Sequence, residues 1–244
     1  MPVPPLLEAG CAPELSEAAG DPAEPLTAHL VELRQRLIIC LAYLAAGTVL
    51  CYGWSGDLLS WLARSAGTVV FTMPTEAFMV RLKAAAFTGF VAFLPLILHQ
   101  VWLFVGRALS PRLRRLSLAL AAASYLLFLL GAGIAMFVVV PAAMKFLLAF
   151  GSDQIRPLMT LSGYLGFVVS LALAFGGVCQ LPILLVLLNR LGVVSRQGLR
   201  SRWRYVYLLA FIVAGILTPP DAFSQIAMAV PAILIFELTL LFLD

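Results

Sequence analysis

Glu32, a carboxylate among arginines, is the side chain in this sequence best suited to hold a cationic group. It lies in a stretch, 27–37, whose leucines recur at helical spacing, and it shares the polar side of that helix with His29 and Arg36. Glu32 and Arg36 are one helical turn apart, where opposite charges attract. A carboxylate also accepts the planar fork of a guanidinium bidentately. Glu32 therefore either binds a cation from outside the chain or pairs with Arg36 or Arg34.

Two further polar side chains stand at the edges of, or inside, long apolar runs. Glu76 lies between two such runs, after Pro74 and before Phe78. Its carboxylate is either a solvated loop group or a functional one. Gln180 lies deep in an apolar run, beside Pro182. A polar group inside a membrane is costly and faces protein or water. The sequence leaves two readings of Gln180 open, a hydrogen bond between helices or the lining of a wet cavity.

Motifs for catalysis are missing from the sequence. It contains no GxxxxGK[ST] phosphate loop, no His-Glu-x-x-His and no Gly-x-Ser-x-Gly, and its two histidines are His29 and His99. The four cysteines show no paired spacing. We expect no enzyme activity, no metal and no cofactor.

The composition predicts an all-α protein that crosses a membrane several times. Apolar residues make up 62% and charged residues 11% of the 244 residues, against about 25% charged in soluble domains; the mean hydropathy is +1.03. A spanning helix needs about 20 apolar residues. Six candidate spans result, of which the last two are short: 37–56, 84–106, 116–144, 157–189, 205–220 and 222–236.

The basic residues predict that both termini are cytoplasmic, because cytoplasmic loops carry the excess of lysine and arginine. With that orientation the inner segments hold Arg34, Arg36, Arg107, Arg112, Arg114, Arg115, Arg190, Arg196, Arg200, Arg202 and Arg204. The outer segments hold Arg64, Arg81, Lys83, Lys145 and Arg156. The net charge of +4 therefore reflects topology, and we expect no nucleic-acid partner. Residues 1–25 are acidic and proline-rich without a basic residue, which predicts a disordered cytoplasmic tail.

Several motifs lie in order along residues 26–242. The first is His29-Leu30-x-Glu32-Leu33-Arg34-x-Arg36-Leu37. The second is Pro95-x-x-x-x-Gln100-x-Trp102-x-Phe104. Ala174-Phe175-Gly176, Pro182 and Leu217-Thr218-Pro219-Pro220-Asp221-x-Phe223-Ser224-Gln225 complete the set. Together these motifs resemble the C subunit of the twin-arginine protein translocase, the TatC family.

That resemblance implies a six-span, cup-shaped receptor over residues 26–244. Such a receptor binds signal peptides bearing paired arginines. With TatA- and TatB-like single-span subunits it exports folded proteins across the cytoplasmic (inner) membrane, using the proton-motive force and assembling with further copies. The implied signal-peptide residues are Glu32, Arg34, Gln100, Phe104 and Gln180. The implied motif residues are His29, Leu33, Arg36, Pro74, Glu76, Phe78, Pro95, Trp102, Pro219, Pro220 and Asp221, with Asp221 expected to cap the last span.

The sequence also departs from the family pattern. Leu113 stands where many members have a second glutamate that contacts the signal, Arg107 stands where a proline is usual, and Gln180 stands where many carry a glutamate. Two other function classes stay open from the residues alone. One is a small-solute transporter with a site near the middle of the membrane, and the other is an intramembrane enzyme that uses His99.

Overall fold

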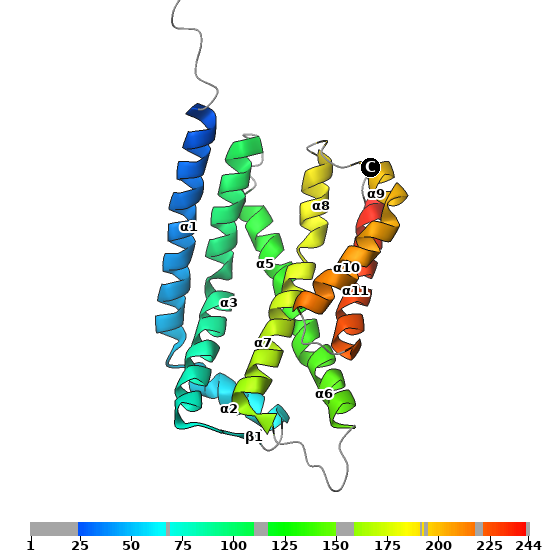
Figure 1. Ribbon diagram of the computed structural model, residues 1–244. Coiled ribbons are helices and arrows are strands. Elements are labelled where there is room, and N and C mark those ends of the chain that lie inside the picture. Colours follow the sequence, from blue (N-terminus) through cyan, green and yellow to red (C-terminus); the bar gives the residue numbers. More distant parts are fainter. Residues whose placement is uncertain are drawn as a thin grey trace, which may run out of the picture.

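The structure, a computed structural model, describes residues 24–66, 69–109, 117–149, 159–190, 192, 195–217 and 222–242. It is built almost wholly of helices (Figure 1). The first half comprises α1 (Glu24–Cys51), α2 (Ser55–Ala66), α3 (Pro74–Leu109), α5 (Ser117–Ile134), the π-helix η1 (Ala135–Val139) and α6 (Val140–Leu148). The second half comprises α7 (Leu161–Val178), α8 (Leu181–Arg190), α9 (Arg196–Ser201), α10 (Trp203–Leu217) and α11 (Ala222–Phe242).

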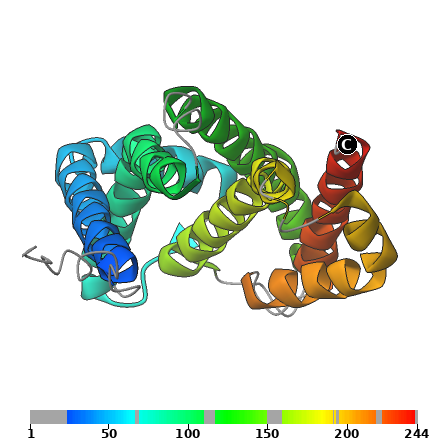
Figure 2. The same cartoon turned by 90° about the horizontal axis from the view of Figure 1, so that it is seen from above.

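Five helical segments of the described residues are long and apolar enough to cross a membrane. They are Leu30–Cys51, Pro74–Gly106, Ser117–Leu148, Leu161–Asn189 and Ala222–Leu241, and Trp203–Ile216 is a shorter apolar helix. Together they give the six expected spans. Seen from above, the helices extend from α1 and α3 at one side of the molecule to α9, α10 and α11 at the other (Figure 2).

The last two spans differ in length, which corrects one expectation. α10 has 15 residues, but α11 has 21 and continues through Glu237 to Phe242. The expectation of a short sixth span is wrong because a charged residue does not end this helix. The Tyr207 hydroxyl donates to Glu237 Oε1 at 2.7 Å, and Arg200 lies 3.8 Å from its Oε2.

The third and fourth spans are each interrupted near a proline. Pro141 lacks the N–H that a continuous α-helix needs, and the π-helical turns of η1 directly precede it. Two residues, 179 and 180, separate the end of α7 from the start of α8, next to Pro182. Gly131 allows α5 to approach α7, since a Cβ there would lie 2.5 Å from the Phe175 carbonyl oxygen. Gly133 has open space around it and plays no such part.

The two ends of the molecule are distinct. α2 and the starts of α3 and α7 lie at one end, which we call the α2 end (Figure 1). Two short parallel strands, β1 (Val69–Val70) and β2 (Met159–Thr160), pair there. The start of α1 and the end of α3 lie at the opposite end, the N-terminal end, together with α9 (Figure 1). The main core lies between, where Leu165, Leu171 and Phe175 of α7 are buried against the neighbouring helices.

Candidate functional site

The site around Glu32 depends on a close contact between α1 and α3. Gly47 and Gly89 are both buried where these antiparallel helices touch. A Cβ on Gly89 would lie 2.4 Å from the Gly47 carbonyl carbon, and one on Gly47 would lie 2.8 Å from the Gly89 oxygen. Only glycine allows this separation. The two backbones are thereby held in one register along the whole pair.

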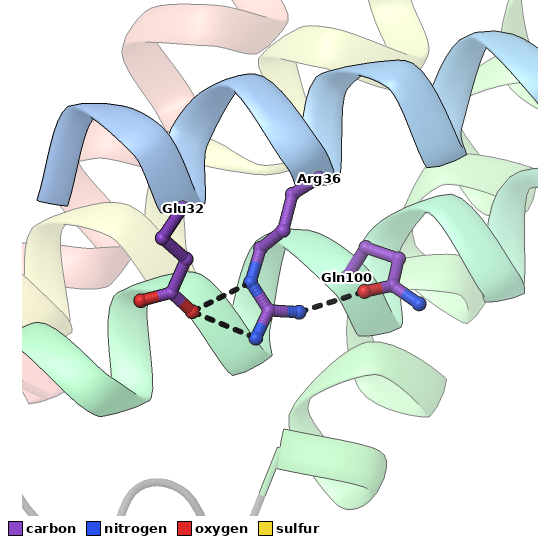
Figure 3. A network of polar contacts seen from close by, with 3 residues as sticks. All are labelled: Glu32, Arg36 and Gln100. Carbon is purple, nitrogen blue, oxygen red and sulfur yellow. Dashed lines mark hydrogen bonds and ion pairs between the residues drawn. The ribbon is translucent and has the colours of Figure 1, made fainter. Parts of the chain in front are cut away.

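That register brings Arg36 to Gln100. Gly47 follows Arg36 by eleven residues, and Gln100 follows Gly89 by eleven. Eleven residues are about three turns of α-helix, so both pairs recur on the same side of each helix. Arg36 Nη1 accordingly donates to Gln100 Oε1 at 2.7 Å (Figure 3). A side chain on α1 is thus held by a side chain on α3.

Arg36 also holds Glu32. Its Nε lies 2.9 Å and its Nη2 lies 2.8 Å from Glu32 Oε1 (Figure 3). The side chains are 12% exposed for Arg36 and 19% exposed for Glu32, so the pair is largely shielded from solvent. The pairing of Glu32 with Arg36, one of the two readings from sequence, is present. It is part of a network that also includes Gln100, which the sequence did not predict.

The arrangement is chemically suited to a guanidinium. Two nitrogens of the Arg36 fork converge on one carboxylate oxygen, which is the contact that an arginine makes and a lysine cannot copy. In a partly desolvated place, a charge-assisted hydrogen bond contributes about 1.5–3 kcal/mol. Glu32 is therefore a fixed and oriented acceptor for arginine.

Other residues predicted for this site lie near it with different surroundings. Arg34 is exposed on α1 and is outside the network, and Leu33 is 45% exposed. Phe104 is half-buried on α3, one turn beyond Gln100. The side chain of His29 lies outside the described part of the structure. The roles of these residues in binding stay predictions.

A second polar network lies on another side of α3. The Trp102 indole Nε1 donates to Ser124 Oγ at 3.0 Å, and Gln180 Nε2 donates to the Ser124 carbonyl oxygen at 2.8 Å. Trp102 and Ser124 are buried. Gln180 thus makes the hydrogen bond between helices that was one of its two readings, and it belongs to a different network from Glu32. Ser124 stands in a run of alanine and leucine without any motif, so residue patterns do not single it out.

Glu76 lies at the α2 end, far along α3 from Gln100. Pro74 is the first residue of α3, where its missing N–H has no cost. Glu76 Oε2 accepts from the backbone N–H and the hydroxyl of Thr72, both at 2.8 Å, and its Oε1 accepts from the N–H of Ser162 in α7 at 3.0 Å. The carboxylate therefore joins the N-termini of two helices. Phe78 is 57% exposed beside it.

Of the remaining predicted positions, one lies in the described part of the structure and the others lie outside it. Pro95 lies inside α3 and is half-buried. Pro219, Pro220 and Asp221, like Leu113 and residues 1–23 of the expected tail, lie outside the described residues. Glu24 and Pro25, which the sequence analysis gave to the tail, already belong to α1.

Comparison with known proteins assigns the family. Residues 28–231 match the family described as Sec-independent protein translocase protein (TatC). The chain belongs to the TatC family. The TatC protein of Magnetococcus marinus is 36% identical over 225 residues, covering 89% of this chain and 83% of that protein. TatC of Escherichia coli K12 is 35% identical over 229 residues, covering 90% and 88%.

A solved structure agrees with this assignment. A crystal structure of the twin-arginine translocase receptor TatC in DDM superposes with a TM-score of 0.80 at 32% identity, covering 88% of this chain and 99% of that chain. TatC proteins are components of a protein translocase and not a family of catalytic enzymes. This TatC chain is accordingly a multi-pass membrane protein of protein translocation.

Proposed function

We propose that this chain is the signal-peptide receptor and core subunit of a twin-arginine translocase, and that Glu32 binds an arginine of the signal. The Glu32–Arg36–Gln100 network carries the proposal. It supplies a carboxylate that is largely shielded, held in place by two helices, and already oriented on a guanidinium. An incoming arginine either joins Arg36 on Glu32 or replaces it, while Gln100 retains Arg36.

The proposed setting is the cytoplasmic membrane, with both termini in the cytoplasm. α9 and the first turns of α1 lie at the same end of the molecule (Figure 1), so their arginines gather there. An excess of arginine marks the cytoplasmic side. TatA- and TatB-like single-span subunits, self-association and use of the proton-motive force belong to the same proposal. The family assignment supports it over a solute transporter or an intramembrane protease.

The proposed test compares peptide binding to the full chain in lipid nanodiscs. One peptide carries a twin-arginine signal and the other has both arginines replaced by lysine. We expect the wild type to prefer the arginine peptide. In Glu32→Gln that preference should fall by about tenfold or more, since a charge-assisted hydrogen bond of about 1.5–3 kcal/mol is lost.

The matched control is Glu76→Gln, because Glu76 lies at the opposite end of the molecule. It should keep the arginine preference of the wild type. Preference that survives Glu32→Gln would move the site elsewhere on the receptor. Equal binding of both peptides by the wild type would refute the receptor function of this chain in isolation.

A further inference from the structure

A cavity at the α2 end has no part in the proposed recognition of the signal. Its volume is about 590 Å³, within the range of about 300–1,000 Å³ typical of ligand sites. α2, η1, α6 and α7 form its walls, which are mostly apolar, with Trp61, Met136, Phe137 and Met144 among the lining residues. The lining also includes the hydroxyl-bearing Tyr164 and the cationic Lys145.

Tyr164 contributes a hydroxyl group to the lining of this cavity. The residue is 5% exposed, and the described residues offer its hydroxyl no hydrogen bond. The hydroxyl oxygen is not among the buried unpaired atoms of the described residues, so it is accessible from the cavity. A tyrosine hydroxyl beside apolar surface normally donates to a partner. A ligand with a hydrogen-bond acceptor in this cavity would satisfy it.

Lys145 supplies a positive charge at the same cavity. It is exposed on α6, and no carboxylate in the described part of the chain forms an ion pair with it. Lys145 lies three residues before the end of the span Ser117–Leu148, and Tyr164 lies three residues after the start of the span Leu161–Asn189. Both polar groups are therefore at the depth of a membrane surface. The apolar walls extend from there along the spans.

We propose that this cavity binds a membrane phospholipid. One acyl chain fills the apolar part, the phosphate lies against Lys145, and the Tyr164 hydroxyl donates to an ester or phosphate oxygen. α2 supports this depth, because it is a short helix with Trp61 at the cavity, and tryptophan favours the membrane interface. The positive charge favours an anionic headgroup and disfavours the basic segment of a signal peptide.

The test uses phosphatidylglycerol with a diazirine near the end of one acyl chain, present at trace level in phosphatidylcholine nanodiscs that contain the full chain. After illumination, the labelled peptides are identified by mass spectrometry. We expect labels in residues 136–149 and 161–168. Lys145→Gln should lower this labelling about five-fold, the effect of about 1 kcal/mol per basic residue at a membrane surface. Tyr164→Phe should lower it as well, since it removes only the hydroxyl.

Two further variants separate binding from a general effect on the protein. Ala149→Trp places a bulky ring at the exposed edge of the cavity and should abolish the labelling without disturbing the core. Lys83→Gln is the matched control, because Lys83 is exposed on α3 and does not line the cavity. Labels spread evenly over the exposed helices would overturn the proposal. The proposal would also be overturned if Lys145→Gln and Ala149→Trp were labelled as strongly as the wild type.

Discussion

Replacing Gly89 by alanine should separate α1 from α3 and weaken the site at their far end. The added methyl group would lie 2.4 Å from the Gly47 carbonyl carbon and 2.5 Å from the Thr48 nitrogen. Both contacts are with backbone, which cannot rotate away as a side chain can. The helices must therefore move apart, and Arg36 and Gln100, three turns away on the same pair of helices, lose their 2.7 Å hydrogen bond.

The size of the effect has two parts. Overpacking a close contact lowers the free energy of unfolding by about 1–3 kcal/mol. For a chain of this length each kcal/mol corresponds to about 2–4 °C, so the melting temperature should fall by several degrees. Loss of the hydrogen bond to the Arg36 guanidinium removes about 1.5–3 kcal/mol from the positioning of Glu32. Affinity for a twin-arginine peptide should therefore decrease together with stability.

The assay is thermal unfolding in detergent together with peptide binding in nanodiscs. Gly133→Ala is the matched control, because nothing lies within 4 Å of the added methyl group. Alanine is the better helix former by about 1 kcal/mol, so this variant should be as stable as the wild type or more so. If Gly89→Ala matches Gly133→Ala in both measurements, the close contact does not position the site and the reasoning fails.

Four other changes test separate parts of the structure. Ser124→Ala leaves the buried Trp102 indole N–H without its acceptor and should cost about 1–3 kcal/mol, measured as a lower melting temperature and a shifted tryptophan emission. In Gln180→Glu the new carboxyl group can donate to the Ser124 carbonyl only when it is protonated, so the melting temperature of this variant should fall as pH rises. The wild-type amide does not titrate, so position 180 should cause no such dependence in the wild type. Glu76→Ala removes the acceptor that joins α3 to Ser162; it should lower stability and leave peptide affinity unchanged, and a loss of affinity would count against that separation. At 15 residues α10 covers about 23 Å, which is less than the thickness of the hydrocarbon core, so we predict that it thins the membrane locally. Insertion of one helical turn into α10 should therefore reduce export. Unchanged export would contradict the prediction.

Some features of the candidate site could be read from residue spacing, and others could not. Glu32 and Arg36 are four residues apart in one helix, so their pairing follows from helical geometry alone. The partners Gln100 and Ser124 come from other helices. Their contacts depend on how those helices pack, and no local pattern in the sequence encodes that register. Gln180 shows the same limit, because its amide was evident from sequence and its partner was not.

Helix boundaries show where sequence reasoning was misled. If charged residues delimit the spans, the last span is predicted to end just before Glu237. In the structure Tyr207 and Arg200 compensate its carboxylate, so that α11 continues. A charge ends an apolar run in the sequence, but it ends a helix only when nothing nearby satisfies it.

The membrane setting, the number of spans and the family follow from composition and from short motifs that are contiguous in the chain. The contacts between polar groups on different helices depend instead on how the helices pack. The glycine contact between α1 and α3 aligns Arg36 with Gln100, and the approach of α5 to α3 and α7 places Ser124 between Trp102 and Gln180. The physical reason is that a hydrogen bond needs atoms within about 3 Å, and between helices that distance is set by packing.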